Sequence, residues 1–204
     1  MFKPLFGVFI SLCALPTVFA HTAIQFTSER TDLFLDQQLT DNIGYLEAGV
    51  PVKLIQTGDH ADRIEITAWR KNKGFKRIWY NQFAKQITDV VLTKTFMQSH
   101  PDIEVLGSKE DPLTGLEWQQ VKLQTWIKKA PLVSELNDFW AETESTYKTE
   151  CSVCHKQRDT KMHDANEWIA VFNGMVGFTD MDEETGKKVL RYLQLHASDA
   201  SQDK

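Results

Sequence analysis

Two cysteines followed directly by a histidine constrain this 204-residue chain more than any other feature of its sequence. The segment reads Cys151-Ser152-Val153-Cys154-His155. On one helical turn, two thiols three positions apart lie on the same side, and the imidazole follows immediately after them. A CxxC pair of this kind can form a disulfide, half of a zinc site, a redox centre or an attachment site for c-type haem.

The surroundings of the motif favour haem over the alternatives. A zinc site needs two more Cys or His ligands, and only His163 lies nearby in the sequence. A thioredoxin-like CxxC follows a strand in a βαβ unit, and the sequence pattern contains no such unit. Two thiols can each add to a haem vinyl group while the adjacent imidazole binds the iron. The motif therefore predicts one covalent haem c, attached through Cys151 and Cys154, with His155 as an axial iron ligand.

The N-terminal segment has the pattern of a secretory signal. Lys3 precedes an almost wholly apolar run over residues 5–15, and small residues, Val18 and Ala20, frame a cleavage position. We expect a signal peptide over residues 1–20, cleaved after Ala20, with an uncleaved membrane anchor as the alternative. Covalent haem attachment takes place outside the cytoplasm, so the signal and the motif together predict a periplasmic protein.

The chain from the motif onward resembles a known family. The segments Glu167-Trp168-Ile169-Ala170-Val171-Phe172-Asn173-Gly174-Met175 and Val189-Leu190-Arg191-Tyr192-Leu193-Gln194, together with the CxxCH motif, are similar to a compact class I cytochrome c domain. More narrowly, residues 46–196 resemble the C-terminal mono-haem region of the pentahaem cytochromes c of bacterial trimethylamine N-oxide respiration. A tetrahaem quinol-oxidising part precedes that region in the family, whereas this chain has one CxxCH and not five.

The resemblance implies a role in anaerobic respiration. It implies a relay of single electrons from a tetrahaem membrane quinol dehydrogenase to a periplasmic molybdopterin reductase of N-oxides or S-oxides. Electrons from quinol would enter through another polypeptide, because the other haem motifs are missing here. The alternative is a haem-based sensory or partner-binding module with a labile sixth iron ligand. A peroxidase-like enzyme would need a distal acid–base residue, for which only His163 offers itself, so we expect an electron carrier without catalytic residues.

The sixth iron ligand sets the reduction potential. In the class I pattern that the chain resembles, the axial methionine lies on the loop before the last helix, at a distance along the chain similar to that between Met175 and Tyr192. We therefore predict Met175 as the ligand, with Met181 as the second choice. A methionine raises the potential relative to a second histidine, and two strong axial ligands leave no position for a substrate. The candidates that follow the motif are Met162, His163, Met175, Met181 and His196.

Helical periodicity outlines the region around the predicted haem. Apolar residues at helical spacing predict a first helix over residues 134–147, capped by Ser134, and a last helix over residues 182–196. These two helices would cross, as in the class I fold. Trp168 is a candidate haem contact, and its alternative role is that of an ordinary core residue.

Residues 22–130 alternate instead between apolar and polar side chains. Segments with this period of two are separated by turn residues, as in a small barrel or sandwich. The segments over residues 64–69 and 121–126 alternate in the same way and both end in Trp, which indicates either two SH3-like units or one barrel with an extension. The predicted strands cover residues 52–55, 63–67, 77–80 and 118–124.

The expected fold class is therefore α+β. A small SH3-like β-barrel over residues 21–132, interpreted as a partner-docking domain, precedes a compact all-α class I cytochrome c-like domain over residues 133–204, which carries the haem. This division follows the change from alternating to helical periodicity in the sequence.

Charge limits the classes of partner. The chain carries 23 Lys and Arg against 28 Asp and Glu, and this net charge of −5 disfavours nucleic-acid binding. The acidic excess lies mainly in residues 140–204, so we expect salt-sensitive docking to a basic rim of a redox partner. Residues 70–77 instead carry five positive charges. That segment is either a solvated hairpin tip or a docking patch for an acidic partner or anionic lipid, and at most peripheral membrane contact is expected.

Overall fold

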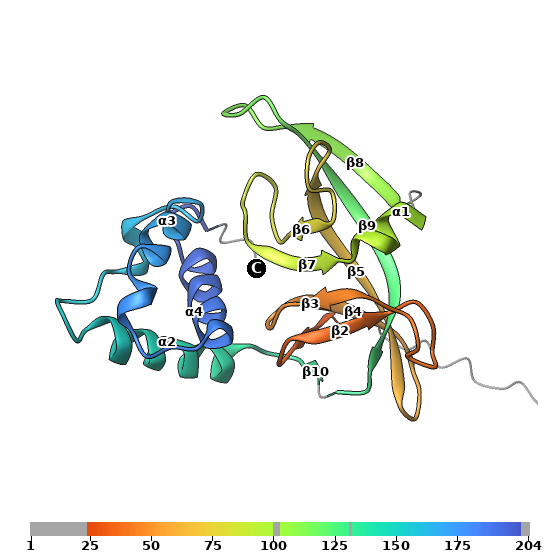
Figure 1. Cartoon of the computed structure of the whole chain (residues 1–204), viewed down its shortest axis with the longest axis horizontal. Coiled ribbons are helices and arrows are strands. Elements are labelled where there is room, and N and C mark those ends of the chain that lie inside the picture. The colour runs from red at the N-terminus through yellow and green to blue at the C-terminus, as the bar shows by residue number, and fades with distance from the viewer. Residues whose placement is uncertain (1–23, 100–102, 131, 201–204) are drawn as a thin grey trace, which may run out of the picture.

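The computed structural model describes residues 24–99, 103–130 and 132–200, and the predicted signal peptide lies outside them. Figure 1 shows the strands gathered on one side of the molecule and most of the helices on the other. The polypeptide therefore builds a β half first and a helical half second, in chain order.

The described strands form one antiparallel sheet in the order β10-β1-β4-β5-β6-β7-β3-β2-β9-β8. An additional pairing of β5 with β9 closes a ring of six strands, namely β5, β6, β7, β3, β2 and β9. The other strands extend this barrel at its margins. The bounds are β1 (Ile24–Thr27), β2 (Thr31–Phe34), β3 (Asn42–Leu46), β4 (Pro51–Thr57), β5 (Ala61–Lys71), β6 (Ile78–Tyr80), β7 (Thr88–Leu92), β8 (Glu104–Glu110), β9 (Glu117–Lys128) and β10 (Leu132–Val133).

The predicted strand segments are confirmed as β4, β5, β6 and β9. In β5, Ile64 and Ile66 are fully buried inside the barrel while their neighbours along the strand are less buried, as a period of two requires. The two similar segments that end in Trp, residues 64–69 and 121–126, pair with each other across β5 and β9. They are neighbouring strands of one barrel, not two separate SH3-like units.

One glycine is required by the closeness of two strands in the barrel. Gly44 in β3 has a φ of 149°, and a Cβ built there would lie 2.2 Å from the carbonyl oxygen of Val91 in β7. Any larger residue would therefore push β3 away from β7. The core beneath these strands consists of Leu33, Ile43, Leu46, Val50, Val52, Ile64, Ile66, Ala68, Trp79, Val90, Leu92, Phe96, Ile103, Val121 and Ile127.

The helical half corresponds in part to the predicted helices. The first predicted helix is α2, but its predicted cap Ser134 is wrong, because the residue before α2 is Leu136 and no side chain caps it. The last predicted helix is α4, where the Asp182 carboxylate accepts the N–H of Thr185 at 2.7 Å. The helices are α1 (Lys94–Ser99), α2 (Asn137–Cys151), η1 (Thr160–Met162), α3 (Glu167–Asn173), η2 (Val176–Phe178) and α4 (Glu183–Leu195).

Across the described ranges, no helix has the length and apolar character needed to cross a bilayer.

A second hydrophobic core lies between α2, α3 and α4. Trp140 of α2 meets Tyr192 of α4 with ring centroids 6.0 Å apart, and this contact marks the crossing of the two helices. Trp168 and Phe172 lie one turn apart on α3 and are both buried. The buried members of this core are Ile87, Tyr147, Ala165, Trp168, Phe172, Val189, Tyr192, Leu193 and Ala197.

The expected fold class is wrong. The chain is dominated by the ten-stranded sheet with its six-stranded barrel, and the helices do not form a compact all-α class I cytochrome c-like domain. The helical core is completed by Ile87, which comes from the segment between β6 and β7 and is 1% exposed. Periodicity along the chain could not reveal this, because it reports which face of an element is buried and not which element covers it.

A buried ion pair joins the two halves. Arg191 of α4 lies 2.7 Å from the carboxylate of Asp89 in β7, and their side chains are 6% and 1% exposed. The guanidinium also donates to the backbone carbonyls of Thr88 at 2.7 Å and Gly49 at 3.3 Å. Burial raises the pKa of Asp89, and Arg191 and Asn81 offset part of that effect. Because both charges are buried, removal of either partner would leave the other charge buried and unpaired, which lowers the free energy of unfolding strongly.

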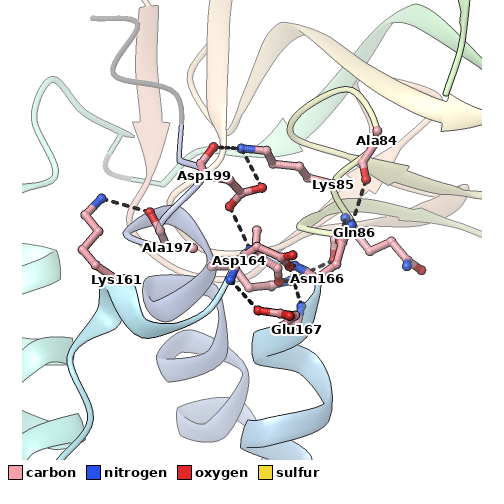
Figure 2. Close-up of polar contacts among 11 residues, drawn as sticks. Ala84, Lys85, Gln86, Lys161, Asp164, Asn166, Glu167, Ala197 and Asp199 are labelled. Atoms are coloured by element: carbon pink, nitrogen blue, oxygen red, sulfur yellow. Dashed lines mark hydrogen bonds and ion pairs between the residues drawn. The ribbon is translucent and has the colours of Figure 1, made fainter. Parts of the chain in front are cut away.

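Figure 2 shows a second set of contacts between the halves. Asn166, next to α3, accepts the N–H of Gln86 at 2.8 Å and donates to the carbonyl of Ala84 at 3.0 Å. Lys85 pairs with the carboxylate of Asp199, beyond α4, at 3.3 Å. The segment between β6 and β7 is thus bonded to the start of α3 and to the residues that follow α4.

Candidate haem site

The CxxCH motif lies where α2 ends. Cys151 is the last residue of the helix and is half-buried, whereas Cys154 and His155 are exposed on the turn that follows. Both thiols are free. Burial, and secondarily the charge of Glu150, raise the pKa of Cys151. A raised pKa keeps that thiol protonated at neutral pH.

A pocket of about 690 Å³ opens beside the motif. Its volume falls within the range of roughly 300–1,000 Å³ that is typical of ligand and cofactor sites. Three basic side chains on its wall, Lys148, Lys156 and Arg158, suit a ligand that carries carboxylates. The sequence reasoning missed these residues, although Lys156 and Arg158 lie within three residues of the motif. The full wall consists of Glu144, Lys148, His155, Lys156, Gln157, Arg158, Asp159, Thr160, Met162 and Tyr192.

Exposed apolar side chains occur in the motif, in the loop that follows it and in η2. In the helical half, within the described residues, the large exposed hydrophobics are Val153 at 79%, Met162 at 57% and Phe178 at 85%. Side chains of this kind favour contact with an apolar surface. Two free thiols, an accessible imidazole, basic side chains and exposed apolar groups together fit an apolar macrocycle with carboxylate arms. The residues present therefore fit haem.

Internal hydrogen bonds brace the loop that forms the pocket wall. The Tyr147 hydroxyl donates to the Arg158 carbonyl at 2.9 Å, and the Trp168 indole donates to the Thr160 carbonyl at 2.9 Å. Burial is the main cause that raises the pKa of Tyr147 to about 12, and it raises that of Tyr192 to the same value. These tyrosines stay neutral at physiological pH and act as fixed hydrogen-bonding and packing groups.

A second brace fixes the start of α3 (Figure 2). Asp164 accepts the N–H of Glu167 at 2.7 Å, and Glu167 accepts the N–H of Asp164 at 3.0 Å, which is the reciprocal pattern of a capping box. Lys161 Nζ donates to the Ala197 carbonyl at 2.9 Å. The loop after the motif is therefore held against the end of α4.

Trp168 lies in the helical core. Its side chain is 0% exposed, and its ring meets the edge of His163 at 4.9 Å between centroids. It is absent from the pocket wall and supports that wall through Thr160. The structure thus gives Trp168 a packing role, and direct contact with a haem remains a prediction.

The structure distributes the candidate sixth ligands over several places. Met162 lines the same pocket as His155, whereas Met175 does not. Met175 is half-buried just before η2, and Met181 packs on the helical core. The N–H of Asp180 donates to Glu150 at 3.3 Å. This contact brings the loop that carries Met175 and Met181 to the end of α2, beside the motif.

The candidate histidines are engaged differently. His196 Nδ1 lies 2.7 Å from the Tyr192 carbonyl, so that nitrogen carries a proton and donates. His163 Nε2 is buried and has no hydrogen-bond partner among the residues that the structure describes. Neither imidazole lines the pocket with His155.

Comparison with known proteins shows the class of protein to which the chain belongs. Residues 20–132, more than half of the chain, match the model of the TorC third cytochrome c domain. This match identifies a region of a c-type cytochrome, a class that holds haem covalently on cysteine thiols. The chain belongs to the TorC third cytochrome c domain family. The match covers the barrel and ends before the CxxCH motif, so the haem assignment rests on residues 151–155 themselves.

Curated relatives agree with this assignment. The chain is 30% identical over 158 residues to the cytochrome c-type protein TorC of Escherichia coli O157:H7 and of strain K12, covering 78% of this chain and 40% of each relative. It is 27% identical over 149 residues to the cytochrome c-type protein TorY of Haemophilus influenzae, covering 72% of this chain and 39% of that protein. The chain thus spans about two fifths of the length of these relatives. No solved structure gives a significant match.

Proposed function

We propose that this protein is a periplasmic cytochrome that relays single electrons through one covalently bound haem, and that it is not an enzyme. The observation that carries the proposal is the placement of two free thiols and an accessible imidazole at the end of α2, beside a pocket whose wall holds three basic and two acidic side chains. A single CxxCH in the sequence corresponds to one haem.

Each residue of the site has a distinct task. Cys151 and Cys154 would hold the haem by two thioethers, and His155 and Met175 would bind its iron, with Met181 as second choice. The bound group supplies an iron that changes by one unit of charge. His155 Nδ1 lies 2.9 Å from the Lys156 carbonyl, which can only accept a hydrogen bond. Nδ1 therefore carries the proton, which leaves Nε2 free to bind iron and fixes the orientation of the ring.

The partners follow from the relatives and from the resemblance. We propose a tetrahaem quinol dehydrogenase of the membrane as electron donor and a periplasmic molybdopterin N-oxide or S-oxide reductase as acceptor, in trimethylamine N-oxide respiration. Residues 140–204 hold 12 acidic and 8 basic side chains, a net charge of −4, and haem propionates add to it. This charge favours weak, salt-sensitive docking of the haem end to a basic surface.

Absorption spectroscopy tests the carrier assignment. Purified protein is examined oxidised, then reduced, then under carbon monoxide. We expect a low-spin spectrum with the weak long-wavelength charge-transfer band of a methionine–iron bond and no change with carbon monoxide. Met175→Ala should abolish that band, while Met162→Ala is the matched control that retains it, and loss of the band in Met181→Ala instead would identify the second-choice ligand. A carbon monoxide shift in the native protein would contradict the carrier and favour a haem-based sensor.

Denaturing electrophoresis with haem staining tests the attachment. Cys154→Ser should leave one thioether or none, and the double variant Cys151→Ala/Cys154→Ala should carry no stain at all. Retention of the stain by the double variant would rule out covalent attachment at this motif.

A further inference from the structure

Two neighbouring turns project from one end of the barrel. β5 ends at Lys71, which pairs with Trp118 near the start of β9, so the turn after β5 and the turn before β9 leave the sheet side by side. The backbone N–H of Asn72 donates to the Glu117 carbonyl at 2.9 Å, and its side chain donates to the Glu117 carboxylate at 2.6 Å. These contacts fix the two turns, over residues 72–77 and 111–116, relative to each other.

Each turn presents a large apolar side chain to solvent. Phe75 is 74% exposed and Leu113 is 93% exposed. Both turns are ordered by their own polar groups. Asp111 accepts the N–H of Leu113 at 3.0 Å and the hydroxyl of Thr114 at 2.5 Å. The fold therefore holds these apolar side chains outward, and nothing in the packing of the barrel requires them to be apolar.

Positive charges flank Phe75 and lie on the strands that carry the two turns, whereas Asp111 and Glu117 are acidic residues at the base of the turn that carries Leu113. Lys73 and Lys76 flank Phe75 and are exposed. Two further lysines are held over aromatic rings, Lys71 at 5.5 Å from the Trp118 centroid and Lys109 at 5.7 Å from the Trp69 centroid. No ion pair within the described residues neutralises any of these side chains. We define the barrel tip as Lys71, Lys73, Phe75, Lys76, Arg77, Lys109 and Leu113.

We infer that the barrel tip binds an anionic phospholipid surface, with Phe75 and Leu113 inserted among the headgroups and the basic side chains above the lipid phosphates. Apolar side chains that enter the interface and lysines that stay near it are the two contributions to peripheral membrane binding. The β8–β9 turn lies at the top of Figure 1 and α2 at its lower left. Binding through the barrel tip would thus leave the haem end free to meet redox partners.

The shape of the barrel tip favours lipid over an acidic protein. Phe75 and Leu113 stand out from two separate turns, so a protein partner would need two matching pockets. A bilayer interface accommodates protruding apolar groups at any position. The barrel tip is rich in basic side chains, whereas the haem end has a net negative charge. Lipid and redox partner would therefore bind different surfaces and would not compete. The inference goes beyond electron relay, since lipid binding can be measured whether or not the haem exchanges electrons.

Vesicle sedimentation of the haem-loaded full-length mature protein tests the inference. The protein should sediment with vesicles of phosphatidylcholine and phosphatidylglycerol but not with vesicles of pure phosphatidylcholine. The sedimented fraction should fall as the salt concentration rises. Each basic side chain near the surface contributes about fivefold in affinity, so Lys73→Glu/Lys76→Glu should weaken binding at least tenfold. Phe75→Ser/Leu113→Ser should weaken binding at low and high salt alike, because it removes the apolar contribution.

Matched controls lie elsewhere on the barrel. Lys94→Glu/Lys128→Glu changes the net charge by the same amount, and Ile24→Ser removes an apolar side chain that is 63% exposed. Both should bind vesicles like the unaltered protein, and thermal unfolding should confirm that all variants fold. Absence of vesicle binding, or equal loss in the control variants, would overturn the inference. Binding to an acidic protein that depends on the barrel tip, without vesicle binding, would replace lipid by a protein partner.

Discussion

The barrel core consists of residues from the barrel strands, α1 and the segments that connect them. The helical core, in contrast, includes Ile87, which belongs to the segment between β6 and β7. The barrel is also closed by hydrogen bonds from strand to strand around its ring. In the helical half, α4 packs against both α2 and α3, and Arg191 and Asn166 fix the helices to the barrel. From this comparison we expect the barrel to be stable by itself, and the helical half to depend on the barrel and on the proposed haem.

The largest expected effect separates the two halves directly. In the haem-free variant Cys151→Ala/Cys154→Ala, we expect amides of α2, α3 and α4 to lose most of their protection from hydrogen exchange. Amides of β5 and β9 should keep theirs, because none of the residues that line the pocket beside the motif lies in these strands. Hydrogen exchange followed by mass spectrometry measures this. Full protection of the helices in the variant would show that the helical half is self-sufficient and would break the comparison.

The next largest effect concerns the buried ion pair. Arg191→Leu leaves the Asp89 carboxylate buried without its partner, so we expect a loss of about 3–5 kcal/mol in the free energy of unfolding. Urea unfolding of the haem-loaded protein measures it. Asp89→Asn/Arg191→Leu should recover part of the loss. Lys188→Leu is the control on the same helix, because its partner Glu184 is exposed and such pairs contribute about 0–1 kcal/mol.

A smaller effect appears at alkaline pH. Tyr147 and Tyr192 have a pKa of about 12 in the folded protein against an ordinary value of 10.0. The neutral phenols therefore contribute stability that is present below pH 10 and is lost as the pH rises from 10 to 12. Tyr147→Phe should make this alkaline loss shallower. At neutral pH it should cost about 0.5–1.5 kcal/mol, since the hydrogen bond to the Arg158 carbonyl disappears.

Urea unfolding at neutral and alkaline pH separates the two effects of Tyr147→Phe. Tyr45→Phe in the barrel is the control and should retain the alkaline slope of the unaltered protein. An unchanged slope in Tyr147→Phe would mean that this phenol does not link helical stability to pH.

The smallest effect concerns the contacts drawn in Figure 2. Asn166→Ala removes two hydrogen bonds to the segment between β6 and β7, and we expect a loss of about 1–2 kcal/mol. The amide of Gln86 should exchange faster, while amides inside β5 should not change. Asn137→Ala, at the start of α2, is the control for a change of the same type, because the Asn137 side chain donates to Glu135 and not to the segment between β6 and β7. Equal effects of the two substitutions would remove Asn166 as a link between the halves.

Much of the local structure could be predicted from the sequence. Alternation located β4, β5, β6 and β9, and helical spacing located α2 and α4. The cap of α2 was wrong because Ser134 precedes the helix by several residues. The fold class was wrong for a different reason. The pairing of β5 with β9 and the insertion of Ile87 into the helical core join residues far apart in the chain, and local periodicity carries no information on such contacts.

The candidate site also has parts that the sequence indicated and parts that only the structure revealed. The motif itself indicated haem, because the chemistry of two thiols and an imidazole depends only on their spacing. The basic wall of Lys148, Lys156 and Arg158 and the supporting hydrogen bond from Trp168 needed the folded chain. The position of Met162 on the same wall as His155 also came from the structure.

The sequence by itself determined the local elements and carried the haem prediction, since covalent motifs and side-chain periodicity act over a few residues. The tertiary structure decided the closed barrel, the shared helical core and the placement of the turns that carry Phe75 and Leu113 at the same end of the barrel. These features arise where segments distant in the chain exclude water together, and the free energy of that burial depends on the whole fold.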